Sequence, residues 1–416
     1  MVNWAKNANI YEVNIRQFSN EGSFEAFGSH LQRLKEMGVE MLWFMPITPI
    51  SIKTRQGSMG SYYACSSYDT INPEFGTLAN FKKLVSDAQA IGLKVIIDWV
   101  ANHTGWDHHW TIEHPDWYVK DKDGNFTEKN GWKDVIDLNF DAGDMRLALI
   151  SAMQYWVKEC GIDGFRCDMA HLVPLDFWID ARTACDSIKP LYWLAECEEP
   201  GYHQAFDTTY AWWFMHQTEK HAKKEANLSS VRDVLHAYTQ YPEGATKLFF
   251  TTNHDENSWN GTEYEKYGIT AKAWAVFTCT WQGLALIYSG QESANTKRLK
   301  FFDKDAIAWN DPLALADFYA RLLALKKNNP AVRDGETFLL PSNHDNEIMA
   351  FLRRKGEDIV LVILNISNQN RIPITVEHPW LTGNFTNLFS GLVFGFEGRE
   401  YFELQAGEYI VYHKQP

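Results

Sequence analysis

Short apolar stretches rich in β-branched and aromatic residues alternate with amphipathic stretches through about the first 300 residues of the chain. This alternation is typical of repeated strand–helix units that build a parallel sheet. Eight stretches have the length and composition of strands: residues 10–15, 41–45, 95–98, 164–167, 191–195, 206–210, 248–252 and 284–288. Eight such units predict an α/β fold, the closed (β/α)8 or TIM barrel.

The connection after the third predicted strand is too long for a simple strand-to-helix loop. Residues 104–141 show no helical or strand period, and they include five large aromatic residues: Trp106, Trp110, Trp117, Tyr118 and Trp132. Loops of this length in compact domains usually have a function. We therefore expect a short excursion over the barrel mouth, with some of these aromatic rings lining a cleft for sugars.

After residue 330 the pattern changes to the alternation of antiparallel strands, at residues 358–366, 371–376 and 401–412. Turn-forming pairs, Lys355-Gly356 and Ala406-Gly407, separate these stretches. The predicted organisation is a barrel domain over residues 1–330, which includes the excursion 104–141, and a C-terminal β-sandwich domain over residues 331–416.

The charge balance excludes several kinds of partner. Lys and Arg number 39 against 53 Asp and Glu, for a formal net charge of −14, and no basic run occurs. We therefore expect neither nucleic acid nor a membrane surface as a partner. No stretch reaches the roughly 18 apolar residues of a membrane span, and residues 1–10 lack a signal-peptide core. The expected location is cytoplasmic, or periplasmic or secreted if a leader has been trimmed.

Ionisable residues stand at the ends of four predicted strands. Asp98 is the last residue of the third strand, and His103 follows it. Arg166 and Asp168 lie at the end of the fourth strand, Glu196 follows the fifth, and His254 and Asp255 follow the seventh. Polar side chains directly after a buried apolar run are poor packing material. Because the active site of such a barrel lies at the carboxyl ends of its strands, we expect these residues to converge there.

These four segments, in this order, resemble the sequence regions of the α-amylase superfamily, glycoside hydrolase family 13. The resemblance extends to residues 60–63, to residues 72–77 and to residues 286–292, and it covers essentially the whole chain. It implies a retaining glycoside hydrolase that cleaves α-1,4-glucosidic bonds in maltooligosaccharides or starch-type glucans. The implied partner is therefore an oligosaccharide or polysaccharide substrate.

The residue types also suit this chemistry. Cleavage through an oxocarbenium-like transition state needs one carboxylate that attacks C1 and one protonated carboxyl group that donates to the leaving oxygen. Asp168 is the expected nucleophile, because Arg166 lies two residues earlier on the same strand face and keeps the carboxylate ionised. Glu196 follows an apolar run whose desolvation raises its pKa, and it is the expected general acid/base.

The resemblance assigns roles to the remaining residues. It implies that Asp255 is the third catalytic acid, which binds sugar hydroxyl groups and stabilises the transition state. It implies that His103, His254 and Arg166 bind the sugar at the cleavage site, and that Tyr63 forms the aromatic platform beneath it.

Two positions depart from the family pattern. Leu172 stands where relatives often have a His whose carbonyl oxygen binds calcium, and Ser67 stands where many have Asp. Asn102 still suits calcium, but spacing assigns no oxygen ligands in the excursion. We therefore assign no metal ligand and expect no required cofactor, with calcium left as an option.

Two alternatives to simple hydrolysis stay open. The same site residues serve glucanotransferases and enzymes directed at sucrose or trehalose, because fold and site are shared across such activities. A catalytically inactive barrel could instead act as a carbohydrate-binding or transporter-associated subunit. Loss of an acid would favour this second alternative, and all three acids are present.

Overall fold

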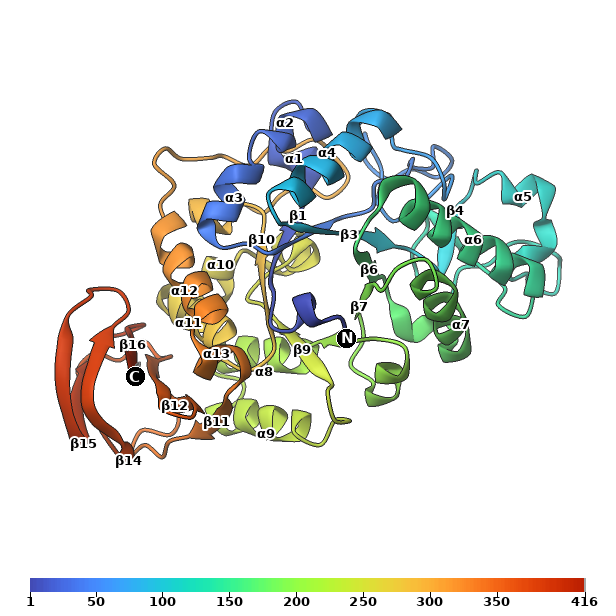
Figure 1. Ribbon diagram of the computed structural model, residues 1–416. Helices are drawn as coiled ribbons and strands as arrows, with labels where there is room; N and C mark the ends of the chain where they lie inside the picture. The colour runs from blue at the N-terminus through green and yellow to red at the C-terminus, as the bar shows by residue number, and fades with distance from the viewer. Residues whose placement is uncertain (415–416) are drawn as a thin grey trace.

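The computed structural model describes residues 1–414, and its larger part is a closed barrel of eight parallel strands (Figure 1). The order around the barrel is β1-β10-β9-β8-β7-β6-β3-β2. The strands are β1 (Asn9–Val13), β2 (Met41–Phe44), β3 (Lys94–Trp99), β6 (Gly164–Cys167), β7 (Tyr192–Ala195), β8 (Thr208–Tyr210), β9 (Thr246–Phe249) and β10 (Leu284–Tyr288). The predicted (β/α)8 fold is confirmed, although β9 begins two residues earlier than expected.

Alternate side chains along each strand separate two apolar layers. One set, including Ile10, Trp43 and Leu248, fills the inside of the barrel. The other set packs outward against the surrounding helices. These are α1 (Ile15–Phe18), α2 (Phe24–Gly28), α3 (Leu31–Met37), α4 (Leu78–Ala90), α6 (Gly143–Cys160), α7 (Leu175–Asp186), α8 (Trp212–Ala222), α9 (Leu228–Tyr238), α10 (Glu263–Tyr267), α11 (Ala271–Thr280), α12 (Ala316–Asn328) and α13 (Pro330–Asp334).

Helices α2 and α3 follow one another closely and are separated only at Ser29 and His30. Helix α3 ends at Gly38, whose φ of 102° lies in the left-handed region. A side chain at this position would also meet Leu323 of α12, because an added Cβ would lie 2.9 Å from the Leu323 Cβ. Glycine is therefore the residue that lets α3 end this close to α12.

The excursion after β3 has a small structure of its own. Strands β4 (His103–Gly105) and β5 (Val135–Asp137) pair antiparallel, and α5 (Trp110–Glu113) lies between them in the chain. Trp110, Trp117 and Tyr118 are buried in the hydrophobic core. The expectation that some of the five aromatic residues line the cleft holds for Trp132, which lines the cavity described below, whereas Trp110, Trp117 and Tyr118 pack in the core.

The C-terminal strands all belong to one antiparallel sheet, ordered β11-β12-β13-β16-β14-β15. The expected antiparallel β domain is confirmed: its strands are hydrogen-bonded in one continuous order, and the β14–β15 hairpin packs over the central strands around a core of its own. The strands are β11 (Glu336–Leu339), β12 (Ile348–Lys355), β13 (Asp358–Asn365), β14 (Ile372–Asn387), β15 (Val393–Leu404) and β16 (Tyr409–Lys414). The sheet is strongly curved, with the β14–β15 hairpin on its outer side (Figure 1).

Both faces of this sheet are covered at its centre. Along β13, Val360 and Val362 join the core shared with the barrel helices, whereas Leu361 and Ile363 join a separate core with the β14–β15 hairpin. The uninterrupted apolar run of this strand reflects burial on both sides. Within residues 1–414, no helix has both the length and the apolar character needed to cross a membrane.

Candidate active site

Asp168 and Glu196 stand side by side where two neighbouring strands end. Strands β6 and β7 pair in parallel, with Cys167 opposite Ala195, so the two acids are the next residues in register. Adjacent strands are about 4.8 Å apart. One guanidinium group joins the two carboxylates, because Arg166 Nη1 lies 2.9 Å from Asp168 Oδ1 and Arg166 Nη2 lies 2.8 Å from Glu196 Oε2.

Arg166 is enclosed beneath these carboxylates. Its Nη1 also lies 2.9 Å from Asp98 Oδ1, and its side chain is 0% exposed. The guanidinium faces the rings of Trp43 and Tyr210 at 4.9 and 5.5 Å. Arg166 does not line the cavity, so the expectation that it binds the sugar is corrected: it points into the barrel and positions three carboxylates.

Burial sets the protonation of the two acids. Burial raises the pKa of Glu196 to about 7, although the charge of Arg166 opposes this shift. The pKa of Asp168 is also raised, to about 6, because burial outweighs the charge of Arg166. Asp168 is still mostly ionised at pH 7, because this pH lies above its pKa. The pKa itself is raised and not lowered, so Arg166 only limits the effect of burial. Of the two groups, Glu196 keeps its proton to higher pH, which suits a general acid.

These two pKa values predict a narrow, bell-shaped dependence of kcat/KM on pH. Below about pH 6 Asp168 is protonated and cannot attack, and above about pH 7 Glu196 is ionised and cannot donate. We expect the maximum between these limits, with both limbs belonging to the coupled pair. Initial rates on a maltooligosaccharide from pH 4 to 9 measure this profile. A flat rate from pH 5 to 8 would contradict the assignment.

Replacing Arg166 with Met is expected to lower the free energy of unfolding by about 3–5 kcal/mol, because it leaves buried carboxylates without their cation. The pKa values of these carboxyl groups then rise further, so the folded state binds more protons than the unfolded state. Stability should consequently fall as the pH rises from 5 to 8, more steeply than in the wild type.

Urea unfolding at pH 5 and pH 8 tests this prediction. The matched control is Arg321→Met, which removes an Arg paired with Asp317 on the exposed surface of α12. This control should change stability by less than about 1 kcal/mol. If the two variants lose equal stability, Arg166 does not hold the carboxylates.

Asp255 follows β9, and its partner is His254. His254 Nε2 lies 3.3 Å from Asp255 Oδ2 and 2.7 Å from the Tyr63 hydroxyl, while Nδ1 contacts Glu12 of β1. Burial disfavours the charged imidazole, but Asp255 and Glu12 outweigh it and raise the pKa of His254. The pKa of Asp255 is lowered, because the charge of His254 outweighs burial. His254 is buried and does not line the cavity, which corrects its expected contact with the sugar.

Tyr63 and His103 do line the cavity. The Tyr63 hydroxyl donates to Asp98 Oδ2 at 3.0 Å, and the ring stacks on that of His254. Burial lowers the pKa of His103 to about 4, so its imidazole is neutral. The ring lies beside Trp132, with 5.4 Å between centroids. Tyr63 thus offers an aromatic face to a ligand, and His103 offers a neutral ring.

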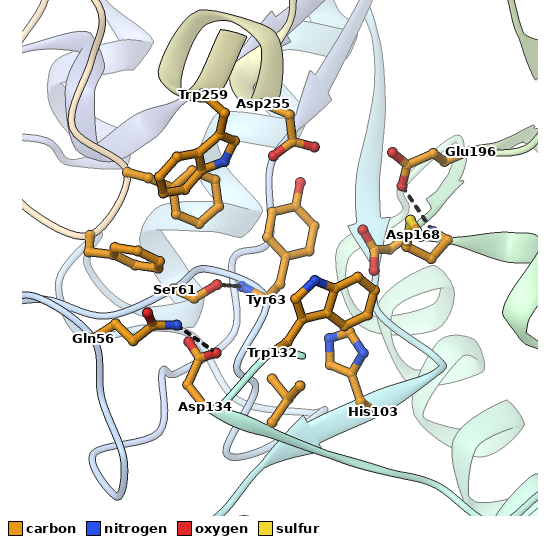
Figure 2. A pocket seen from close by; sticks show the side chains of 14 residues that line it. Gln56, Ser61, Tyr63, His103, Trp132, Asp134, Asp168, Glu196, Asp255 and Trp259 are labelled. Carbon is orange, nitrogen blue, oxygen red and sulfur yellow. Dashed lines mark hydrogen bonds between the residues drawn. The ribbon is translucent and has the colours of Figure 1, made fainter. Parts of the chain in front are cut away.

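Figure 2 shows the resulting cavity, which has a volume of about 370 Å³, near the lower end for ligand pockets. Five of the seven predicted residues line it: Tyr63, His103, Asp168, Glu196 and Asp255. The other lining residues are Gln56, Ser61, Trp132, Asp134, Val135, Met169, Trp259, Phe301 and Phe302. Apolar rings beside a few convergent carboxylates suit a sugar, which has an apolar C–H face and a polar rim.

Sequence reasoning missed Glu12 and most of the loop residues around the cavity. Glu12 had a signal, because it is a charged residue inside an otherwise apolar strand and is completely buried. Gln56, Asp134, Trp259 and Phe302 gave none, because they lie in separate connections, Trp259 in the short helical segment η5 (Glu256–Asn260), with no spacing that relates them. Only the fold brings these connections together.

The described residues do not form a set of side-chain ligands for calcium. Within residues 1–414, no group of three or more His, Cys, Asp or Glu side chains is placed to share a metal ion. The Asn102 amide contacts His103 Nδ1 at 3.1 Å, and Leu172 supplies no imidazole. Asp137 has both carboxylate oxygens buried without a hydrogen-bond partner in the described residues, but it belongs to no such group of three. No step below depends on a metal, and the absence of a cofactor requirement stays a prediction.

The arrangement defines a class of site. Two neighbouring carboxyl groups of different pKa, with a third acid and an aromatic platform in one cavity, have the composition that glycosidic bond cleavage requires. The family of the α-amylase catalytic domain matches residues 7–123 and 111–336, and that of the maltogenic amylase C-terminal domain matches residues 337–412. The chain therefore belongs to the α-amylase family.

Similar proteins agree with this membership. The chain is 28% identical to the α-amylase MalA of Haloarcula japonica over 93% of its own length and 59% of MalA, so it spans about three-fifths of that relative. The crystal structure of a noncanonic maltogenic α-amylase from Thermotoga neapolitana superposes with a TM-score of 0.91 at 29% identity, covering 99% of both chains. An α-amylase from Lactobacillus plantarum gives 0.89 at 28% identity, covering 99% and 100%.

Proposed function

We propose that the protein is a retaining glycoside hydrolase that cleaves α-1,4-glucosidic bonds in maltooligosaccharides or starch-type glucans. The observation that carries this proposal is the pair Asp168 and Glu196, held by one guanidinium group at the floor of the cavity. Carboxyl groups this close leave no room for a water molecule between them and the sugar. They favour retention over inversion.

In the first step, Asp168 attacks C1 of the bound sugar while Glu196 gives its proton to the leaving oxygen. In the second step, the ionised Glu196 takes a proton from water, and the hydroxyl oxygen displaces Asp168 from C1. Asp255 binds sugar hydroxyl groups beside the reacting carbon. The neutral His103 and the ring of Tyr63 contact the same sugar, while Arg166 and His254 fix the acids from behind.

Transfer to a sugar acceptor is the second candidate. It uses the same first step, with a hydroxyl group of another sugar in place of water. An α-1,4-glucan:maltose-1-phosphate maltosyltransferase of Burkholderia pseudomallei is 26% identical over 79% of this chain and 32% of that protein. The inactive alternative is not favoured, because all three acids line one cavity.

An NMR time course on maltoheptaose, with and without added glucose, tests the proposal. We expect the α-anomer at the newly formed reducing end to appear first and the β-anomer to follow by mutarotation. A β-anomer that appears first would overturn retention. Products longer than the substrate, formed in preference to short ones, would identify a transferase.

A further inference from the structure

Glu12 is a carboxylate buried inside the barrel, and it does not line the cavity. Along β1, Tyr11 and Val13 pack outward against the helices. Glu12 therefore points into the barrel, as Ile10 does. Its Oε1 contacts His254 Nδ1, and its Oε2 has no hydrogen-bond partner in the described part of the chain. Because an unpaired buried charge is costly, Glu12 depends at this position on His254 as its charged partner.

The neighbours of His254 require a hydrogen on both ring nitrogens. Nδ1 faces the carboxylate of Glu12, which accepts a hydrogen bond. Nε2 lies 2.7 Å from the Tyr63 hydroxyl oxygen and 3.3 Å from Asp255 Oδ2. That hydroxyl group donates its one hydrogen to Asp98 Oδ2 at 3.0 Å, so its oxygen is left to accept from Nε2. With a donor on each side, the ring is a positively charged imidazolium.

A chain of hydrogen bonds connects this ring to the reacting acids. The Tyr63 hydroxyl links His254 to Asp98. Asp98 Oδ1 then accepts from Arg166 Nη1 at 2.9 Å, and Arg166 in turn holds the nucleophile and the acid/base. The guanidinium and the imidazolium are thus shared among five carboxyl groups: Glu12, Asp98, Asp168, Glu196 and Asp255. Of these two positive groups, the imidazolium is the one that can lose its proton, because arginine stays charged.

We propose, on the basis of the function above, that Glu12 is a positioning residue: as the buried counter-ion of His254, it keeps the ring charged and turned with Nε2 toward Asp255. A carboxylate bound to one ring nitrogen of a histidine sets the charge and direction of the other. The positive ring behind Asp255 keeps this carboxylate ionised and fixes how it meets the sugar hydroxyl groups. Glu12 does not touch the sugar, so it acts on the rate of the chemical step more than on substrate binding.

The pKa directions of the pair agree with this role. Burial raises the pKa of Glu12, and the charge of His254 opposes the rise. Burial also disfavours the charged His254, but Asp255 and Glu12 outweigh it and raise its pKa. Without the charge of Glu12, the pKa of His254 falls, and the ring loses its proton at a pH at which the wild type keeps it. The other charged or titratable groups around the pair are unchanged by such a variant: Tyr63 after β2, Asp98 of β3, Arg166 of β6, Tyr210 of β8 and Tyr288 of β10.

Glu12→Gln removes the charge and keeps the shape of the side chain. Its kcat on maltoheptaose at pH 8 should fall by about 10- to 100-fold relative to the wild type, as expected for the loss of a hydrogen bond between charged groups, with a much smaller change in KM. The loss should shrink toward pH 5, because acid restores the proton of His254. Glu12→Asp keeps the charge, so its activity relative to the wild type should not vary with pH. For Glu12→Gln, no loss, or a loss that is the same at every pH, would overturn the proposal.

Glu263→Gln is the matched control for a buried glutamate. Glu263 is buried as well, but it accepts from Thr251 and Gln291 and belongs to no part of the chain of hydrogen bonds described above. Its kcat should follow that of the wild type at every pH. Melting temperatures of all variants check that each one folds.

NMR spectra of protein labelled with ¹⁵N in its histidines test the charge without any substrate. At pH 8 the wild type should show a hydrogen on both ring nitrogens of His254, in signals assigned by their absence from His254→Asn. Glu12→Gln should keep one of the two hydrogens. A neutral His254 in the wild type would overturn the proposal, even if Glu12→Gln does not fold. A charged His254 in a wild-type protein that cleaves no glucan would instead refute the proposed function.

Discussion

The Asp168→Asn variant is expected to fold like the wild type and to lose hydrolysis by roughly 10⁴-fold or more, a loss typical of a missing nucleophile. The amide has nearly the same volume as the carboxylate, and its oxygen still accepts from Arg166 Nη1, which lies 2.9 Å from Asp168 Oδ1. An amide, however, cannot form the covalent bond to C1. The loss should therefore appear in kcat with every substrate.

Initial rates on maltoheptaose, together with a thermal unfolding curve, measure this effect. The matched control is Asp233→Asn on the exposed surface of α9, which should keep full activity. Asp168→Asn activity within tenfold of the wild type would remove Asp168 from the mechanism. A variant that does not unfold cooperatively would be replaced by Asp168→Glu, which keeps the charge and displaces the attacking oxygen.

The Glu196→Ala variant should lose about 10²- to 10⁴-fold on natural substrates, because no group protonates the leaving oxygen. For a substrate with an activated leaving group, such as a glycosyl fluoride or a nitrophenyl glycoside, the rate of the first step should fall much less. Added azide should then accelerate the second step, because azide attacks C1 without a general base. The product is the glycosyl azide of retained configuration.

This rescue distinguishes Glu196 from the other acids. Asp168→Ala should form no azide of retained configuration on the same substrate, because it lacks the group that forms the intermediate. Nearby Glu198 is a useful control, because it is also buried but is paired with Lys247 Nζ at 2.6 Å, outside the cavity lining. If azide rescues Glu198→Ala and leaves Glu196→Ala unchanged, the general acid/base has been assigned to the wrong residue.

The barrel could be predicted because its strands are short apolar runs that end in conspicuous polar residues. Strands β6 and β10 match the predicted ranges, and all eight strands were located. The C-terminal domain was harder, because alternation along β14 identifies a strand but does not say whether strands form one sheet or two. The pairing of β13 with β16, and of β16 with β14, makes it a single sheet.

For the site as well, one part could be predicted from the sequence and another part could not. Asp168, Glu196 and Asp255 follow strands, so local sequence locates them. The direction in which Arg166 and His254 point depends on neighbours from other strands, Asp98 and Glu12 among them. Local sequence cannot separate a residue that touches the sugar from one that lies directly behind it.

The aromatic residues of the excursion show most clearly that sequence alone does not tell which side chains face the cavity. Their number predicted a sugar-binding surface, but Trp110 and Trp117 pack edge to face, 4.9 Å apart, in the core. These rings extend the core of the barrel into the excursion, because they belong to the same cluster of buried residues as the outward side chains of the strands. Which ring is left over to face the cavity is decided by packing alone.

We expect Asp168 to form a covalent bond to C1 of an α-glucoside while Glu196 serves as acid and base. Incubation of Glu196→Gln with α-maltosyl fluoride tests it most directly, because fluoride leaves without protonation and the missing base slows release. Mass spectrometry of the digested protein should show one maltosyl unit on the peptide that contains Asp168. A maltosyl group on Asp255, or turnover with no labelled peptide and a β-configured product, would contradict the account.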